Sequence, residues 1–399
     1  MSNPIVFVPG LFGSLGDDVI KGTGDFSFGF AEDIYRPFID ILNSMGYIEN
    51  ENLFISFYDW KKPCEFIARK YLATAIDKAR YKSGSRKVDI ICHSMGGLVT
   101  RAYIQDLDYR DDVDKVIMVG VPNAGVVNSY FFWSGGVIPY SKVEENIFYK
   151  VLKVGFGMYL KTVYKMSYIE LLRKVFPSSK DLLPSYEYGD YLMLEDDSYE
   201  KETIPIVNMK TRNDFLNELK HKGWMGVDTY IIGGKGKKTN KYLSVDIDTK
   251  NGTKWLDGKP KNIYTTNLGD GTVVLGSSIS FYGENLVLEG DHVDILYKSK
   301  DFLSQILNHK ATYILEQEKK TNQIYNIIAT NCNIASSDFL DIEDDNISTI
   351  KLGENSYWIR IKDVENIEFN TFDQSILGTE GNLILFNVKE NGEVKYEFR

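Results

Sequence analysis

The amino-acid sequence predicts an α/β protein with a doubly wound, mostly parallel sheet. In residues 1–125, short apolar runs alternate with segments whose apolar residues recur at helical spacing. The expected strands are residues 4–8, 52–57, 87–92 and 115–120, and the expected helices between them are residues 31–45, 63–82 and 96–105. Alternation of this kind is typical of parallel strands whose crossover helices cover both faces of the sheet.

The pattern changes after residue 125. Residues 128–225 hold few strand signals and many bulky apolar residues at helical spacing, so we expect a helical insertion that caps the sheet. Strand signals return at residues 229–234 and 271–275, and residues 301–318 are expected to form the closing helix. The first domain is therefore predicted to span residues 1–320.

Residues 321–399 are predicted to form a small β-rich appendage. The expected strands are residues 324–328, 356–361, 367–372, 382–388 and 394–398, the last two joined through Glu390-Asn391-Gly392 as a hairpin. The appendage is acidic, which fits either a protein partner or simple solubility, and we favour solubility.

Composition and charge exclude several classes of protein. The net charge of −10 argues against nucleic acid as a partner, because binding phosphates requires clustered Lys and Arg. The three cysteines, Cys64, Cys92 and Cys332, have the spacing of neither a zinc site nor a disulfide framework, and we expect no metal and no cofactor. Without a signal-like N-terminus or an apolar run of about 18 residues, we expect a cytoplasmic protein.

One stretch runs against the acidic background. Residues 141–180 are basic and rich in aromatic residues, a composition that fits contact with an anionic lipid surface. A solvated helix face explains the same composition equally well. Peripheral membrane contact through the insertion is therefore one of two interpretations.

A candidate nucleophile lies in residues 88–98. An apolar strand run breaks at a small-residue turn into an amphipathic helix, with Ser94 at the turn. This pattern is typical of a nucleophile elbow, which lifts a serine hydroxyl clear of the sheet edge so that a base can take its proton. Gly96 keeps the second small residue of the pattern, whereas Cys92 stands where a first glycine is usual.

The chain offers four histidines as the base for Ser94. His93 adjoins the nucleophile and is expected to point the wrong way, His221 lies upstream of the best acid candidate, and His309 lies within a predicted helix. His292 remains, on a glycine-bearing loop that enters an apolar segment. Histidine suits the role because its pKa allows proton transfer near neutrality.

Asp270 is the candidate acid that would orient His292. It stands between Gly269 and Gly271, where a tight turn precedes a short apolar run. The chain order Ser94, Asp270, His292 matches that described for serine enzymes with an elbow. The bland alternative for Asp270 is an ordinary turn residue.

Two backbone amides are expected to stabilise the oxyanion that the serine would create. One belongs to Met95, directly after the candidate nucleophile. The other belongs to the glycine-punctuated loop after the first strand, where we assign Leu11, with Phe12 as the alternative. An ordinary strand-ending turn explains the same loop.

These residues resemble the lecithin:cholesterol acyltransferase and lysosomal phospholipase-like branch of the α/β-hydrolase superfamily, whose core bacterial lipases share. The similar stretches are Val8-Pro9-Gly10-Leu11, Tyr58-Asp59-Trp60, His93-Ser94-Met95-Gly96-Gly97, Pro177-Ser178 with Leu182-Leu183-Pro184, Gly269-Asp270-Gly271-Thr272-Val273 and His292-Val293. The resemblance covers roughly residues 4–320. Lys61 departs from it, since the family favours arginine after the tryptophan.

The resemblance implies a serine acylhydrolase or acyltransferase that works through an acyl-enzyme. Ser94 would be the nucleophile, Asp270 the orienting acid and His292 the general base and then acid. We therefore predict a carboxylic ester hydrolase of the lipase or phospholipase type, with a lipid ester as substrate and a lid in residues 128–225. A lipid O-acyltransferase with the same residues is the first alternative. A catalytically silent module that binds lipid or protein is the second, and the sequence does not identify a protein partner.

Overall fold

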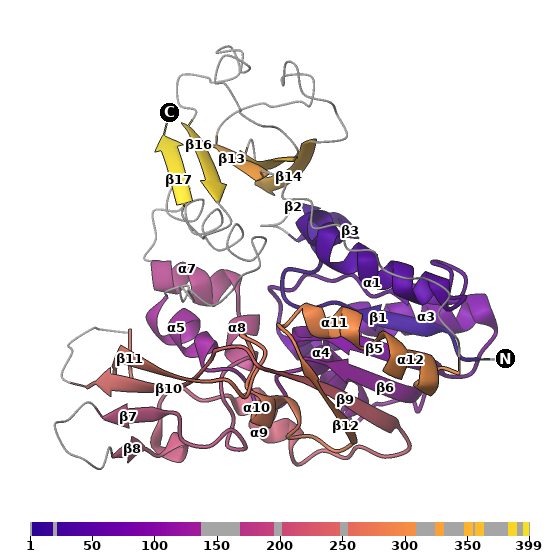
Figure 1. Cartoon of the computed structure of the whole chain (residues 1–399), viewed down its shortest axis with the longest axis horizontal. Helices are drawn as coiled ribbons and strands as arrows, with labels where there is room; N and C mark the ends of the chain where they lie inside the picture. Colours follow the sequence, from indigo (N-terminus) through magenta and orange to yellow (C-terminus); the bar gives the residue numbers. More distant parts are fainter. Residues whose placement is uncertain are drawn as a thin grey trace. The chain divides into compact units, whose positions relative to one another are not determined.

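The computed structural model of the protein describes residues 2–18, 22–136, 168–194, 202–247, 254–308, 324–330, 347–353, 356–362, 382–388 and 394–398. The described residues form two compact units (Figure 1). One is drawn from Met1–Ser14, Asp33–Pro139 and Ile169–Leu315, and the other from Leu15–Glu32, Tyr140–Tyr168 and Glu316–Arg399.

The first unit is built on a six-stranded sheet with the order β12-β9-β6-β5-β1-β4. Every neighbouring pair in it is parallel. Its strands are β1 (Ile5–Val8), β4 (Leu53–Ile55), β5 (Val88–His93), β6 (Val113–Val119), β9 (Asp228–Lys235) and β12 (Glu284–Glu289). The four central strands are rich in fully buried apolar residues, which is what a parallel sheet covered on both faces requires. The predicted α/β fold class is confirmed.

One predicted strand is wrong. Residues 271–275 form a loop that enters the short helix α10 (Leu275–Ser278), and the sixth strand of the sheet is β12 instead. The reason is local: Asp270 Oδ1 accepts hydrogen bonds from the amides of Thr272 and Val273, so these amides are turned away from any sheet. β12 escaped prediction because it begins and ends with glutamate and alternates between exposed and half-buried residues.

Helices follow the strands at the predicted places, and α11 is an additional helix; residues 309–318 of the predicted closing helix lie outside the described residues. The helices are α1 (Glu32–Ser44), α2 (Cys64–Ile67), the π-helical turn η2 (Ala68–Leu72), α3 (Ala73–Ser83), α4 (Met95–Ile104), α11 (Asp294–Lys298) and α12 (Lys300–Ile306). α4 packs on β1, β5 and β6, so the helix that follows Ser94 lies over the centre of the sheet. None of the described helices is long and apolar enough to cross a bilayer.

The insertion is mixed, not wholly helical as predicted. Its described helices are α5 (Asn128–Gly135), α7 (Tyr168–Val175), α8 (Ser178–Asp181), η3 (Ile206–Asn208) and α9 (Asp214–Leu219). It also supplies β7 (Leu192–Leu194) and β8 (Thr203–Ile204), which join β10 (Thr239–Asp246) and β11 (Lys259–Thr266) in a four-stranded sheet. Two strands this short leave little periodicity to detect, and their partner β10 lies far along the chain. Residues 137–167 and 195–201 of the insertion lie outside the described residues.

The second unit is a seven-stranded sheet with the order β17-β16-β13-β15-β14-β2-β3. Its strands are β2 (Leu15–Asp18), β3 (Thr23–Ser27), β13 (Ile324–Thr330), β14 (Ile347–Gly353), β15 (Ser356–Lys362), β16 (Asn382–Val388) and β17 (Val394–Phe398). Trp358 is buried against Phe30 in its core, and its indole donates to Asn326. The C-terminal strands thus pair with a segment from near the N-terminus that the sequence did not mark. The predicted strand at residues 367–372 and the turn at residues 390–392 lie outside the described residues.

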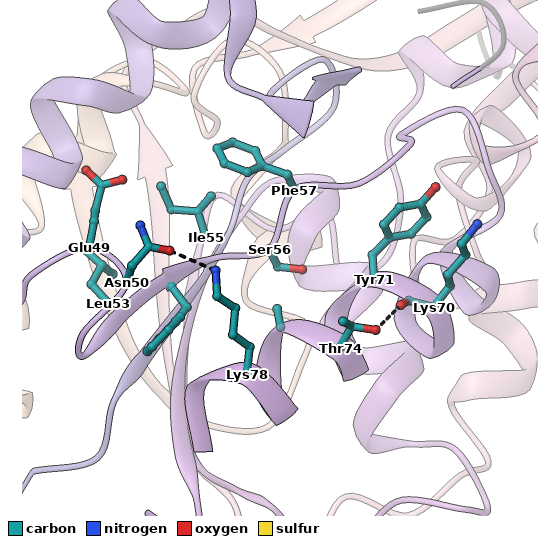
Figure 2. Close-up of a pocket in the computed structure, with 12 residues that line it drawn as sticks. Glu49, Asn50, Leu53, Ile55, Ser56, Phe57, Lys70, Tyr71, Thr74 and Lys78 are labelled. Atoms are coloured by element: carbon teal, nitrogen blue, oxygen red, sulfur yellow. Dashed lines mark hydrogen bonds between the residues drawn. The ribbon is translucent and has the colours of Figure 1, made fainter. Parts of the chain in front are cut away.

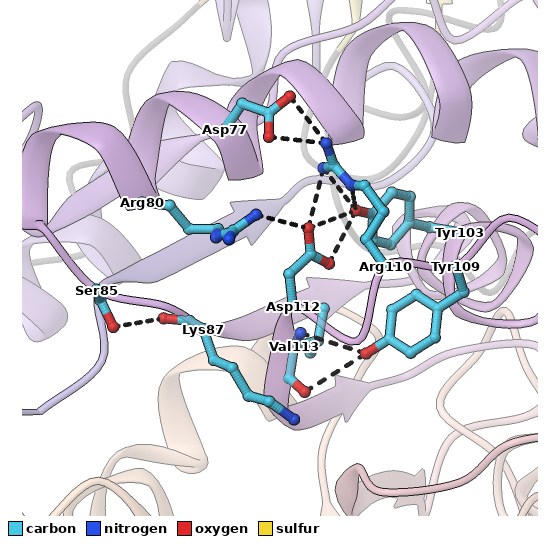
Figure 3. Close-up of polar contacts among 9 residues, drawn as sticks. All are labelled: Asp77, Arg80, Ser85, Lys87, Tyr103, Tyr109, Arg110, Asp112 and Val113. Atoms are coloured by element: carbon cyan, nitrogen blue, oxygen red, sulfur yellow. Dashed lines mark hydrogen bonds and ion pairs between the residues drawn. The ribbon is translucent and has the colours of Figure 1, made fainter.

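An ionic cluster around one buried carboxylate lies at the amino ends of the central strands (Figure 3). Asp112 directly precedes β6, is 1% exposed and accepts hydrogen bonds from the Tyr103 hydroxyl at 2.9 and 3.0 Å. Arg110 and Arg80 form ion pairs with the same carboxylate at 3.0 and 3.3 Å, and Arg110 also reaches Asp77. We call these five residues the Asp112 cluster.

A hollow of about 560 Å³ lies beside β4, which is an edge strand of the parallel sheet (Figure 2). The residues after β4 and one side of η2 and α3 line it, and Lys78 donates to Asn50 across its rim at 2.9 Å. None of the predicted site residues, all of which lie in the described part of the chain, lines this hollow. The predicted chemistry therefore has to be sought elsewhere, at the carboxyl ends of the strands.

Candidate active site

Ser94 occupies a strained turn between β5 and α4. Its backbone has φ 52° and ψ −128°, a region that residues with a side chain rarely adopt. The turn is tight enough to require glycine at position 96, where a Cβ would lie 2.3 Å from the Val8 carbonyl oxygen. Cys92 does not crowd the turn, because its thiol is buried in the sheet near the Ile117 carbonyl. The local sequence thus folds as an elbow despite lacking the first glycine.

Asp270 and His292 are in direct contact. His292 Nδ1 lies 2.8 Å from Asp270 Oδ2, and the two side chains are 5% and 1% exposed, respectively. Because the carboxylate can only accept, Nδ1 carries the proton and Nε2 is the ring atom left for proton transfer. Their loops meet at the end of β9, where Lys235 accepts from the Gly290 amide and the Lys237 amide donates to Gly269.

His292 also lies beside the residue that precedes Ser94. The rings of His93 and His292 have their centroids 4.8 Å apart, and His93 Nε2 lies 2.9 Å from the His292 carbonyl oxygen. Both Ser94 and His292 belong to the described residues, and no hydrogen bond joins the Ser94 hydroxyl to the His292 ring. Such bonds are often long in enzymes without substrate and tighten when it binds.

The loop after β1 approaches Ser94 from the other side. A Cβ on Gly10 would lie 2.9 Å from Ser94 Cβ, so only glycine permits this approach. The Gly13 amide donates to the Gly10 carbonyl and closes a turn, in which the amides of Leu11 and Phe12 take no part. Met95 is the first residue of α4, and its amide is among those that a helix leaves without an internal partner. Leu11 directly follows Gly10, which lies against Ser94, and Met95 directly follows Ser94; their role as oxyanion donors stays a prediction.

Part of the chain resembles a known protein family. The family model described as lecithin:cholesterol acyltransferase matches residues 27–222. The match covers just under half of the chain and supports the predicted lecithin:cholesterol acyltransferase-like branch of the α/β-hydrolases. The match begins after the loop that follows β1 and includes Ser94, while Asp270 and His292 lie beyond it.

Several solved structures are remotely similar. The propeptide form of Bacillus licheniformis lipase BlEst2 is 11% identical with a TM-score of 0.40, and the match covers 100% of this chain and 93% of that one. The mature form of the same lipase is 14% identical with a TM-score of 0.39, with coverage of 77% and 92%. A chain of the Tle4-Tli4 complex is 14% identical with a TM-score of 0.42, with coverage of 67% and 69%.

The family-like stretch Tyr58-Asp59-Trp60 braces the loop after β1. The Tyr58 hydroxyl donates to the Pro9 carbonyl at 2.5 Å, and the Trp60 ring packs edge-on against Phe12 with centroids 4.3 Å apart. Lys61, where the family favours arginine, forms a buried ion pair with Asp59 at 2.5 Å. The substitution thus keeps a cation beside this aspartate.

An aromatic shelf extends from this stretch into the insertion. Trp60 stacks on Phe176 with centroids 5.1 Å apart and an interplanar angle of 7°, and Phe132 meets Phe176 at 6.3 Å. With Phe12, these rings form a continuous stack in which Trp60 and Phe176 are buried, at 3% and 2% exposed, and Phe12 and Phe132 are partly exposed at the two ends. We call Phe12, Trp60, Phe176 and Phe132 the aromatic shelf.

Sequence reasoning missed two polar residues at this site. The sequence argument rejected His93 as a base and did not single out Tyr35 of α1. In the structure, the Tyr35 hydroxyl oxygen lies 2.9 Å from His93 Nδ1. Burial and the neighbouring His292 lower the pKa of His93 well below its usual range, so its ring is neutral. The position of His93 beside the nucleophile was a signal, whereas nothing local to Tyr35 marks it. Of the other histidines, His221 is exposed after α9, and His309 lies outside the described residues.

Proposed function

We propose that this chain is a serine-dependent carboxylic ester hydrolase that acts on lipid esters through an acyl-enzyme. The observation that carries the proposal is the buried 2.8 Å contact between His292 Nδ1 and Asp270 Oδ2, in which His292 packs on His93, the residue directly before a serine at positive φ. A carboxylate on Nδ1 fixes the tautomer that can accept a proton at Nε2. The family match supports the same class, since its name describes an acyltransferase, and acyl transfer to water is hydrolysis.

The proposed reaction has two halves. His292 Nε2 takes the hydroxyl proton of Ser94 as the serine oxygen bonds to the ester carbonyl carbon, and the amides of Leu11 and Met95 hold the oxyanion. The intermediate collapses, the bond to the alcohol oxygen breaks, and His292 returns the proton to that oxygen. Water then attacks the acyl-enzyme, giving its proton to His292, which passes it to Ser94 as the fatty acid leaves. Asp270 stays ionised and stabilises the imidazolium in both halves.

The aromatic shelf supports an apolar acyl group as the substrate. Its partly exposed end, Phe12, directly follows Leu11, so an acyl chain attached to the reacting carbonyl would meet this ring, and the buried rings of Trp60 and Phe176 support it from behind. Burying such a chain contributes about 0.8 kcal/mol per methylene group. Interface contact through the basic stretch stays a prediction, because most of residues 141–180 lie outside the described residues.

Lipid O-acyltransfer is the second candidate, and the acyltransferase name of the matching family favours it. It requires no other residues, because a lipid alcohol replaces water in the second half of the reaction. A catalytically silent binding module is disfavoured, since backbone strain at Ser94 costs stability and has no evident use without chemistry.

Fatty-acid release from a panel of phospholipids and triglycerides tests the proposal. Wild type is expected to release acid, and Ser94→Ala is expected to lose this activity while Ser83→Ala, an exposed serine at the end of α3, retains it. Equal release by wild type and Ser94→Ala would reject the proposal. Adding a lipid alcohol separates the two candidates: ester formed faster than free acid identifies an acyltransferase.

A further inference from the structure

Three hydrogen bonds connect four segments around Ser94. The Gly10 amide donates to the Tyr35 hydroxyl oxygen at 2.9 Å, and this hydroxyl lies 2.9 Å from His93 Nδ1. His93 Nε2 in turn lies 2.9 Å from the carbonyl oxygen of His292. The chain of contacts runs from the loop that bears Leu11, through α1 and the end of β5, to the loop that bears His292.

Only one arrangement of protons satisfies all three contacts. A carbonyl oxygen can only accept, so His93 Nε2 must carry a hydrogen. In a neutral ring Nδ1 is then an acceptor, and the Tyr35 hydroxyl must donate to it. The remaining lone pairs of that hydroxyl accept the Gly10 amide. A positively charged His93 would put hydrogens on both ring nitrogens and leave the Tyr35 hydroxyl hydrogen without this acceptor.

Burial keeps His93 in that state. Its side chain is 0% exposed and that of Tyr35 is 1% exposed, so neither exchanges these bonds for water. Gly10 is also required, because a Cβ there would lie 3.1 Å from the Tyr35 oxygen and 3.2 Å from His93 Nδ1. We call these three hydrogen bonds, from Gly10 through Tyr35 and His93 to His292, the relay. Each donor and acceptor in the relay has one direction, so no single bond can reverse without breaking its neighbour.

We propose that Tyr35 and His93 are positioning residues that lock the oxyanion loop and the backbone of His292 to the strand that carries Ser94. The inference rests on the proposed function of Ser94 and His292. Asp270 holds the His292 ring by Nδ1, and His93 holds the His292 backbone by its carbonyl, so the base is fixed at two points. Neither Tyr35 nor His93 takes a proton in the reaction.

Tyr35→Phe tests the relay with little change of volume. The change removes the donor to His93 Nδ1 and the acceptor for Gly10, so kcat for a soluble ester is expected to fall about 10-fold with KM nearly unchanged. Tyr103→Phe is the matched control, since it also removes a buried hydroxyl, from the Asp112 cluster. It is expected to lower the melting temperature and keep kcat. Unchanged kcat in Tyr35→Phe would overturn the proposal.

Substitution of His93 provides a second arm. Glutamine can still donate to the His292 carbonyl, whereas leucine fills the space without donating. His93→Gln is therefore expected to retain about 10-fold more kcat than His93→Leu at similar stability. Equal kcat in the two variants would mean that the donated bond does not matter and would contradict the relay.

A measurement independent of activity separates failure of this inference from failure of the proposed function. Nitrogen-15 NMR of histidine-labelled protein, with His93→Gln to assign the signal, reports the tautomer and titration of His93. The relay predicts a neutral ring with hydrogen on Nε2 and no titration between about pH 5 and 8. Hydrogen on Nδ1, or a titration in that range, would overturn the relay even in an active enzyme. If wild type showed no hydrolysis that depends on Ser94, the proposed function would be overturned instead.

Discussion

The two ends of the central strands carry two polar networks of different kinds. At the amino ends, the Asp112 carboxylate is held by two arginines and a tyrosine (Figure 3). At the carboxyl ends, the groups around Ser94 are held by a neutral histidine, a tyrosine hydroxyl and backbone atoms, and the serine backbone is strained.

This difference indicates that the amino ends of the strands serve the stability of the sheet, whereas the carboxyl ends serve the proposed chemistry. In the Asp112 cluster, two arginines and a tyrosine hydroxyl all contact the one carboxylate, so the cluster fixes the start of β6. The site instead directs His292 through one carboxylate and one backbone contact, which leaves its Nε2 for a reacting hydroxyl. Substitutions at the two ends are therefore expected to change different quantities.

The largest effect is expected at Asp270. Asp270→Asn keeps an oxygen for the amides of Thr272 and Val273 but turns an amide toward His292, which favours the wrong tautomer. We expect kcat to fall about 10⁴-fold with little loss of stability. Asp291→Asn is the matched control, because Asp291 also accepts two backbone amides and is not bonded to the ring. A similar fall in kcat for both variants would contradict the claim that the Asp270 carboxylate orients His292.

At the opposite end, Asp112→Asn is expected to change stability and not activity. It removes the charge that faces Arg80 and Arg110, so we expect a loss of about 2 kcal/mol in the free energy of unfolding with kcat unchanged. Asp77→Asn, at a carboxylate that is 55% exposed, is expected to cost less than about 0.5 kcal/mol. Urea unfolding measures both. A large loss of kcat in Asp112→Asn would mean that the two ends are coupled and would break the comparison.

Asp181 provides a third case for the comparison, because it is a buried carboxylate that accepts from a backbone amide, whereas Asp112 is paired with arginines. It accepts from the Cys64 amide at 2.7 Å, and burial raises its pKa to about 6. Because the folded pKa lies above the unfolded value of 3.8, the folded state binds the extra proton between these values, and stability falls as pH rises toward 6. Asp181→Asn should remove this loss, roughly 1 kcal/mol between pH 5 and 7. A difference between the two proteins that stays constant with pH would contradict the assignment.

Local features of the fold were predictable from sequence because they depend on neighbouring residues. The strand, turn and helix around Ser94 follow from an apolar run and two glycines, and the loops of Asp270 and His292 are marked by their own glycines. The contact between Asp270 and His292 agrees with the prediction of a pair, and their catalytic roles remain proposals.

Contacts between distant segments were not predictable in the same way. The bond between Tyr35 and His93 joins residues 58 positions apart, and α1 looks like any other amphipathic helix. The pairing of β2 with β14 likewise joins the two ends of the chain through a segment with few apolar residues. The wrongly predicted strand at residues 271–275 has a different cause. The Asp270 carboxylate accepts hydrogen bonds from the amides of Thr272 and Val273, which a strand would use for pairing.

The most direct test of the central claim is to locate a fluorophosphonate adduct by mass spectrometry. The probe reacts only with a serine whose proton a neighbouring base removes. We predict a single adduct on Ser94 in folded wild type, no adduct there in Ser94→Ala, and strongly slowed labelling in Asp270→Asn. Folded wild type that stays unlabelled at Ser94, or equal labelling rates in wild type and Asp270→Asn, would contradict the claim that Asp270 and His292 activate this serine.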